Sequence, residues 1–166
     1  MRKTVIVLIS FLWIFLVVGC SNEKDNTNKK DDKQEIIHCT INLDKDDTKA
    51  NYTIESTYDI YGTDNIVHKI ISHEKVMSDD PKTLSYFEDY LNNTYEDFNN
   101  KYSGYNFKIE KSENQVISDV TIDYDIMEME SYVKNNPEML TYVNDEKKLT
   151  MESAKKIYES MNGICK

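Results

Sequence analysis

Glycine and proline, the residues that break regular structure, are scarce in this sequence of 166 residues, which has four glycines and two prolines. No glycine-rich loop for phosphate is present, and no cysteines or histidines have the spacing of a zinc site. The longest apolar run, residues 5–18, has about 14 residues, whereas a membrane-spanning helix needs roughly 20. The absent motifs exclude P-loop nucleotide enzymes and small zinc domains, and the apolar run is shorter than a typical membrane-spanning helix.

Basic residues are fewer than acidic residues. The chain has 20 lysine and arginine residues against 30 aspartate and glutamate residues, which gives a net charge of −10. A domain this acidic is not drawn to nucleic acid or to anionic lipid by electrostatic attraction. We therefore expect no nucleic-acid partner, and because no cofactor-binding motif is present we expect no cofactor.

The N-terminus has the pattern of a secretory signal. Arg2 and Lys3 precede the apolar run, which ends in Val17-Val18-Gly19-Cys20. This ending resembles the lipobox of bacterial lipoproteins, in which the signal peptidase cuts before a diacylglyceryl-modified cysteine. We expect residues 1–19 to be removed and Cys20 to be lipidated, which places the chain on the extracytoplasmic face of the cell membrane. The alternatives are an uncleaved short anchor and an ordinary signal peptide with an incidental cysteine.

The segment 20–35 contains no apolar residue after its first cysteine. A segment that cannot bury apolar surface stays disordered, so we expect a flexible tether here. A single folded domain is expected over residues 36–166, because about 130 residues can bury one adequate hydrophobic core. No internal repeat or second linker divides this domain.

Alternation of apolar and polar residues predicts five strands. The alternation is clearest in residues 51–61, which begin with Tyr52 and Ile54 on one face. Residues 62–65 predict a hairpin turn after that strand. The remaining strands are expected at residues 36–43, 66–76, 105–109 and 116–124.

A long helix is expected between the third and fourth strands. Asp80 provides its N-cap and Pro81 its first turn. From Leu84 to Tyr102 the apolar residues recur at helical spacing, and Gly104 ends the pattern.

Two shorter helices follow the strands. One is expected within residues 126–133, and the other begins after a Thr150 cap and would end with Gly163 as its left-handed residue. The order βββ-α-ββ-(α)-α predicts an α+β fold, in which helices pack on an antiparallel sheet of about five strands.

Two cysteines remain once Cys20 is assigned to lipidation. An even number outside the cytoplasm favours a disulfide, here between Cys39 in the first strand and Cys165 after the last helix. The alternative is a pair of free thiols.

Several of these features together resemble the YehR-like small bacterial lipoproteins. The shared features are the lipobox, Cys39-Thr40, the tyrosine-rich second strand, residues 118–125 (SDVTIDYD) and the ending Gly163-Ile164-Cys165-Lys166. The resemblance covers most of residues 36–166 and is weakest in 126–148. It implies an α+β domain with a paired terminal cysteine. That family's domain has no assigned function, so the resemblance brings no catalytic residues.

Tyr86 and Tyr90 are the candidates for partner binding. They lie four residues apart in the predicted helix, away from the apolar stripe that begins at Leu84, and Asp97 falls on the same ridge. Tyrosines beside acids are typical of surfaces that contact sugars or peptides. The alternative is that residues 126–145 cover both tyrosines as part of the core.

Asp119, Asp123 and Asp125 are weak candidates for a metal site, since their carboxylate oxygens could gather a calcium ion. A solvated sheet face is the favoured interpretation of these acids. The three histidines are likewise better explained as surface residues than as metal ligands.

No nucleophile and base are recognisably paired, so we expect a protein that is not an enzyme. The features favour non-catalytic binding or scaffolding at the bacterial cell envelope. One partner would be the membrane, through the lipid anchor, and another an envelope protein or glycan. Two alternatives stay open: a lipoprotein that binds calcium or a small ligand, and an envelope hydrolase whose site is assembled from distant carboxylates.

Overall fold

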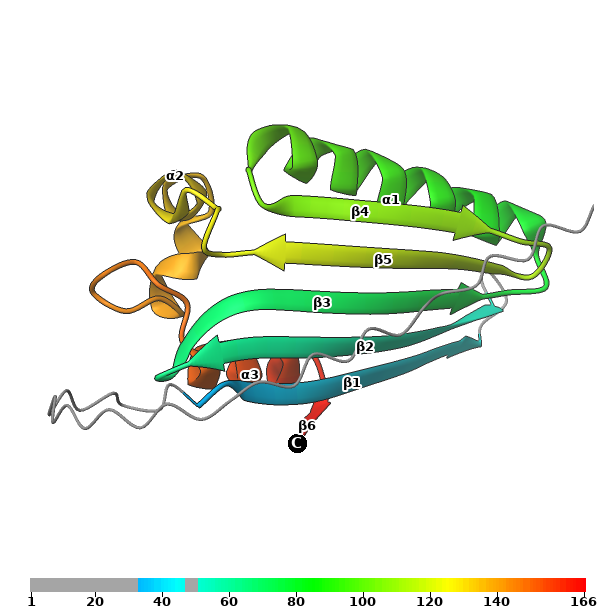
Figure 1. The fold of residues 1–166 in the computed structure, drawn as a ribbon. Coiled ribbons are helices and arrows are strands. Elements are labelled where there is room, and N and C mark those ends of the chain that lie inside the picture. Colours follow the sequence, from blue (N-terminus) through cyan, green and yellow to red (C-terminus); the bar gives the residue numbers. More distant parts are fainter. Residues whose placement is uncertain (1–32, 47–50) are drawn as a thin grey trace, which may run out of the picture. The chain divides into compact units, whose positions relative to one another are not determined.

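Six strands form one sheet: β1 (Glu35–Asp46), β2 (Asn51–Thr63), β3 (Ile66–Met77), β4 (Tyr105–Lys111), β5 (Gln115–Asp123) and β6 (Ile164–Cys165). They lie in the order β4-β5-β3-β2-β1-β6, and every neighbouring pair is antiparallel (Figure 1). This computed structural model describes residues 33–46 and 51–166. The expected signal segment 1–19, the expected lipidation site Cys20 and the expected tether as far as residue 32 lie outside the described residues.

Four helical segments complete the domain: α1 (Pro81–Lys101), α2 (Met129–Asn135), the 3₁₀ helix η1 (Pro137–Thr141) and α3 (Met151–Ser160). The predicted α+β fold with an antiparallel sheet is therefore confirmed, and β6 adds a sixth strand beside β1. In the described part of the chain, no helix is both long and apolar enough to cross a membrane.

Side-chain caps determine where the two longer helices begin. The Asp80 carboxylate accepts hydrogen bonds from the backbone N–H groups of Lys82 and Thr83, at 3.1 and 3.2 Å. The Thr83 hydroxyl also donates to this carboxylate, and these hydrogen bonds lower the pKa of Asp80. Thr150 caps α3 in the same way, because its Oγ1 accepts from the backbone N–H of Ser153 at 3.1 Å. Both predicted caps are confirmed.

The end of α3 differs from the prediction. Asn162, and not Gly163, has the left-handed backbone, with φ of 63°, a conformation that asparagine tolerates. Glycine is needed at 163 for another reason, because a Cβ there would lie 2.6 Å from the carbonyl oxygen of Tyr158. The close approach lets the chain turn from the helix directly into β6.

Two hydrophobic clusters lie on the same face of the sheet. The larger cluster, next to α3, contains Cys39, Ile60, Val67, Ile70, Leu149, Met151 and Ala154. The smaller cluster, next to α1, contains Leu84, Leu91 and Val116. Val116 pairs with Val76 of β3, and Val76 is an even number of positions from Ile70, so both clusters share one face. The helices α1 and α3 therefore cover this face, and alternate strand residues point to the other, polar face.

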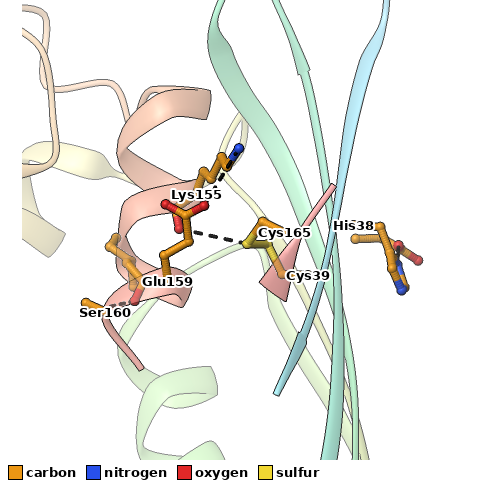
Figure 2. Close-up of a disulfide and its surroundings, with 8 residues drawn as sticks. His38, Cys39, Lys155, Glu159, Ser160 and Cys165 are labelled. Atoms are coloured by element: carbon orange, nitrogen blue, oxygen red, sulfur yellow. Dashed lines mark hydrogen bonds and ion pairs between the residues drawn. A yellow bond between two sulfur atoms is a disulfide. The ribbon is translucent and has the colours of Figure 1, made fainter. Parts of the chain in front are cut away.

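Cys39 of β1 and Cys165 of β6 form a disulfide (Figure 2). The predicted pairing is confirmed, and the alternative of two free thiols is wrong. Backbone hydrogen bonds join His38 and Lys166 in both directions, at 3.0 and 2.9 Å, and hold β6 against β1. The bridge spans a sequence separation of 126 residues and ties the C-terminus to the first strand.

Candidate functional site

Tyr86 and Tyr90 project into solvent from α1, with 64% and 53% of their surface exposed. Their ring centroids are 6.2 Å apart and their planes are nearly parallel, at 14°. Residues 126–145 do not cover them, so the alternative that they belong to the core is wrong. The exposure leaves both rings accessible to a partner.

The first half of α1 is held by aromatic packing beneath these tyrosines. Phe87 lies edge-to-face against Tyr86 at 5.6 Å and against Tyr52 of β2 at 4.8 Å. We call Tyr86, Tyr90, Phe87 and Tyr52 the aromatic surface. Phe87 and Tyr52 are half-buried and connect Tyr86 to the sheet, and Tyr90 is joined to this group through its ring contact with Tyr86.

Several polar groups flank the aromatic surface, among them a neutral amide and an ion pair. Asn93 is exposed one turn beyond Tyr90. Asp97, the acid expected on this ridge, forms an ion pair with Lys101 at 2.6 Å. Two flat rings with hydroxyl edges beside an amide can stack on a sugar or peptide and donate or accept hydrogen bonds. None of these groups is a nucleophile activated by a base.

A half-buried carboxylate at the centre of the covered face was not predicted. Glu74 of β3 lies in register between Ser56 of β2 and Ser118 of β5. It accepts hydrogen bonds from the hydroxyls of Tyr58 and Tyr95, at 2.8 and 2.7 Å. A charge removed from water needs such donors. The signal in the sequence was an acid at an inward-facing strand position.

The tyrosines around Glu74 join the two hydrophobic clusters. Tyr95 comes from α1, and Tyr58 packs on Tyr158 of α3 with 4.2 Å between ring centroids. Burial, and next the charge of Glu74, raise the pKa of both Tyr58 and Tyr95. Their hydroxyls therefore stay protonated and act as donors. We interpret this network as structural, because it positions both helices over the sheet.

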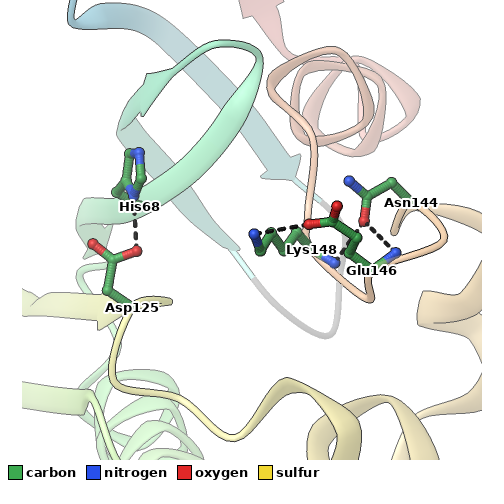
Figure 3. A network of polar contacts seen from close by, with 5 residues as sticks. All are labelled: His68, Asp125, Asn144, Glu146 and Lys148. Carbon is green, nitrogen blue, oxygen red and sulfur yellow. Dashed lines mark hydrogen bonds and ion pairs between the residues drawn. The ribbon is translucent and has the colours of Figure 1, made fainter. Parts of the chain in front are cut away.

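A cavity of about 320 Å³ lies at the end of the sheet, between the start of β3, the connection that follows β5 and the loop that precedes α3. We call it the loop-end cavity. Figure 3 shows the polar residues around it, with His68 and Asp125 on one side and the loop of Asn144, Glu146 and Lys148 on the other. Its lining residues are Ile66, Val67, His68, Tyr124, Asp125, Met127, Met129, Glu146, Lys147, Lys148 and Leu149. Sequence reasoning missed this cavity because its residues come from three separate segments.

A β-bulge gives His68 its place at this cavity. Gly62 of β2 pairs with Val67, and the preceding residue Tyr61 pairs with Lys69, so His68 is the extra residue on β3. A bulge of this kind re-aims a side chain relative to simple alternation. The Nδ1 atom of His68 lies 2.7 Å from a carboxylate oxygen of Asp125.

The three aspartates considered for calcium are used in other contacts. Asp119 pairs with His73 at 2.7 Å and Asp125 pairs with His68. Asp123 accepts a hydrogen bond from the backbone N–H of Asp125 at 3.1 Å. Asp119 and Asp123 are separated by about 13 Å along β5. Within residues 33–46 and 51–166, no group of three or more acidic, histidine or cysteine side chains is arranged to hold a metal ion.

All three histidines lie at the surface, and each is paired with an aspartate. The third pair is His38 with Asp59, at 2.7 Å. Two of the pairs cross between neighbouring strands on the polar face of the sheet. They stabilise that face as opposite charges or hydrogen bonds across strands do. The prediction that the histidines are surface residues is confirmed.

No protein-family model matches the chain, and no curated protein matches it. Among solved structures, the chain is similar to one described as the NMR structure of a protein from Streptococcus pneumoniae TIGR4. The identity is 11%, the match covers 95% of this chain and 99% of that one, and the TM-score is 0.47. We base no inference about fold or function on a likeness this weak.

Proposed function

We propose that the chain is a lipid-anchored protein of the YehR-like kind on the extracytoplasmic face of the bacterial cell membrane. Its domain binds a protein or glycan of the cell envelope and catalyses no reaction. The observation that carries the binding role is the exposed, nearly parallel pair of rings at Tyr86 and Tyr90.

Physical reasoning supports a contact role for the aromatic surface. Burying a whole aromatic side chain removes roughly 150–250 Å² from water, and Tyr86 and Tyr90 still expose 64% and 53% of their surface to a partner. Tyrosine is also enriched in the central parts of interfaces. Phe87 packs against Tyr86, and Tyr86 lies nearly parallel to Tyr90, so less conformational entropy is lost when a partner orders the two rings. A preformed apolar surface with hydroxyl edges suits a flat sugar ring or an extended peptide.

The lipid anchor rests on the lipobox that ends at Cys20 and is tested separately. We expect the Cys20→Ala variant to carry no acyl chain, because the substitution removes the sulfur to which the diacylglyceryl group is attached, whereas two or three acyl chains hold the native protein firmly at the membrane. The mass of the native N-terminal peptide should exceed the unmodified value by a diacylglyceryl group and, where present, an N-acyl group. An unmodified Cys20 in the membrane fraction would contradict the anchor.

Binding through the aromatic surface can be tested in intact cells. A photo-crosslinking amino acid in place of Tyr90 should give a specific adduct, whereas the same amino acid in place of Lys156, an exposed residue of α3, should not. The Tyr86→Ser substitution should weaken the adduct formed at position 90. Loss of the adduct on protease or on muralytic digestion distinguishes a protein partner from a glycan. Equal adducts at positions 90 and 156 would refute the proposal.

The loop-end cavity gives independent support to a second function, the binding of a small ligand. The calcium alternative has no comparable support, because in the described part of the chain no three acidic, histidine or cysteine side chains are grouped to hold a metal ion. The hydrolase alternative has none either, because Glu74 is hydrogen-bonded to two tyrosines that stabilise the fold.

A further inference from the structure

The apolar part of the loop-end cavity is built from residues that are almost fully buried. Val67 and Leu149 are each 2% exposed and Met127 is 6% exposed, and Met129 and Tyr124 continue the lining. Methionine side chains adapt to apolar groups of different shape. This part of the cavity suits a small aliphatic or aromatic side chain.

The polar part of the same cavity carries both signs of charge. Asp125 lies on one wall beside His68. Lys148 and Glu146 form an ion pair at 2.9 Å on the other wall, next to Lys147. Acids and bases are balanced here, although the chain as a whole has a net charge of −10. A balanced site attracts a ligand that carries a cation and an anion at once.

Backbone hydrogen bonds attach both walls of the loop-end cavity to β3. The Val67 N–H donates to the carbonyl of Leu149 at 3.0 Å, which fixes one wall, and the Tyr124 N–H donates to the carbonyl of His68 at 2.8 Å, which fixes the other. Two adjacent residues of β3 therefore position both walls. A site that is preformed in this way loses less entropy when a ligand binds.

Asn144 orders the loop that carries the charged residues of the second wall. Its side-chain oxygen accepts hydrogen bonds from the backbone N–H groups of Glu146 and Lys148, at 3.0 and 2.9 Å. Lys147 between them has a left-handed backbone, with φ of 62°. The strained residue is stabilised by this turn, and the turn presents the ion pair to the cavity.

A second cavity, of about 300 Å³, adjoins the first at the His68–Asp125 pair. His68 and Asp125 line both cavities, and the second cavity adds Lys69, Asp123 and Tyr61. The His68–Asp125 pair is therefore shared by both cavities.

We propose that the loop-end cavity binds a small zwitterion with an apolar side chain, the chemical class of free apolar amino acids and short peptides. The ammonium group interacts with Asp125, the carboxylate with Lys148, and the side chain with Met127 and Leu149. This site is separate from the aromatic surface, so its test is independent of the envelope-binding role.

Methionine methyl groups give a direct readout of binding. In protein labelled with ¹³C at the methionine methyls, titration with the dipeptide Leu-Leu should shift the Met127 and Met129 signals in a saturable way. The Met77 and Met161 signals, from residues outside the cavity lining, should stay in place. The same dipeptide with an acetylated N-terminus and an amidated C-terminus should bind about a hundredfold more weakly, because it lacks both charges. No saturable shift with Leu-Leu, or equal affinity for the capped dipeptide, would refute the proposal.

Two substitutions test the assigned contacts. Lys148→Gln and Asp125→Asn should each weaken Leu-Leu binding about tenfold while leaving the capped dipeptide unaffected. Lys156→Gln is the matched control, because it removes the same charge from an exposed ion pair with Glu152 at 2.6 Å on α3. Equal loss of affinity in the Lys156→Gln variant would mean that general charge, and not the cavity, determines binding.

Discussion

Glu74 shows how a single residue organises the interior of this domain. Its carboxylate lies on the covered face of β3 and accepts hydrogen bonds from one tyrosine on each side, Tyr58 and Tyr95. A carboxylate in this position would destabilise the fold if the donors were missing, because its lost hydration would not be replaced. The two hydroxyls and the nearby Ser118 supply that replacement, with Ser118 Oγ at 3.4 Å.

The contribution of these hydroxyls can be measured with one conservative substitution. We expect Tyr95→Phe to lower the free energy of unfolding by about 1–2 kcal/mol, because it leaves a half-buried carboxylate with one donor fewer. Urea denaturation followed by circular dichroism gives the value. The matched control is Tyr86→Phe, which removes a hydroxyl from an exposed ring and should change the stability by less than about 0.5 kcal/mol. Equal effects of the two substitutions would contradict the role of Glu74.

At the scale of elements, the shortest strand, β6, joins the C-terminus to the first strand. The strand β6 has two residues, yet it pairs with β1 and carries Cys165 to the completely buried Cys39. Gly163 permits the tight passage from α3 into this strand. The last helix is thereby held against β1 by a covalent bond as well as by packing.

Reduction of the disulfide should weaken the domain strongly. The bond closes a loop with a separation of 126 residues, and the chain-entropy model assigns such a loop up to ~5 kcal/mol. We expect dithiothreitol to lower the free energy of unfolding by about 3–5 kcal/mol in urea titrations of the native protein. The Cys39→Ala/Cys165→Ala variant should be insensitive to dithiothreitol. An unchanged midpoint of the native protein after verified reduction would refute this expectation.

At the scale of the whole molecule, buried and half-buried tyrosines are a shared feature of both helix-covered regions. Burial is the main cause that raises the pKa of six of them: Tyr58, Tyr95, Tyr105, Tyr124, Tyr132 and Tyr158. In the unfolded chain, tyrosine loses its proton near pH 10. The folded state therefore keeps protons that the unfolded state releases.

This difference determines how stability depends on pH. Below pH 10 both states are protonated and the full stability is present, and above pH 10 stability falls because the unfolded state binds fewer protons. Each tyrosine that keeps its proton should contribute a loss of about 1.4 kcal/mol per pH unit. Urea denaturation at pH 8, 9, 10 and 11 measures the slope.

The Tyr95→Phe variant serves as the control for this slope. Its free energy of unfolding should fall less steeply above pH 10, by about 1.4 kcal/mol per pH unit, because one tyrosine fewer keeps its proton in the folded state. A free energy of unfolding that is the same at pH 8 and pH 11 would show that these tyrosines ionise equally in both states.

Much of the secondary structure could be predicted because its causes are local. Alternation identified the five longer strands, and Asp80 and Thr150 marked the starts of α1 and α3 through caps that need only residues two or three positions away. The cysteine count indicated the disulfide, since only two cysteines remained to pair. The exposure of Tyr86 and Tyr90 also followed from helical spacing, although the sequence left open whether another segment covers them.

The contacts that form the candidate binding cavity join residues far apart in the sequence, so only the tertiary structure shows them. The pairing of His68 with Asp125 joins residues 57 positions apart, and it depends on a β-bulge that no spacing in the sequence reveals. The loop-end cavity and the Glu74 network arise in the same way, from side chains that meet only after the sheet has formed. By itself the sequence therefore determined which elements form, because helix and strand periods are local. Their packing decided which side chains share a cavity, because that depends on register, twist and the ends of strands.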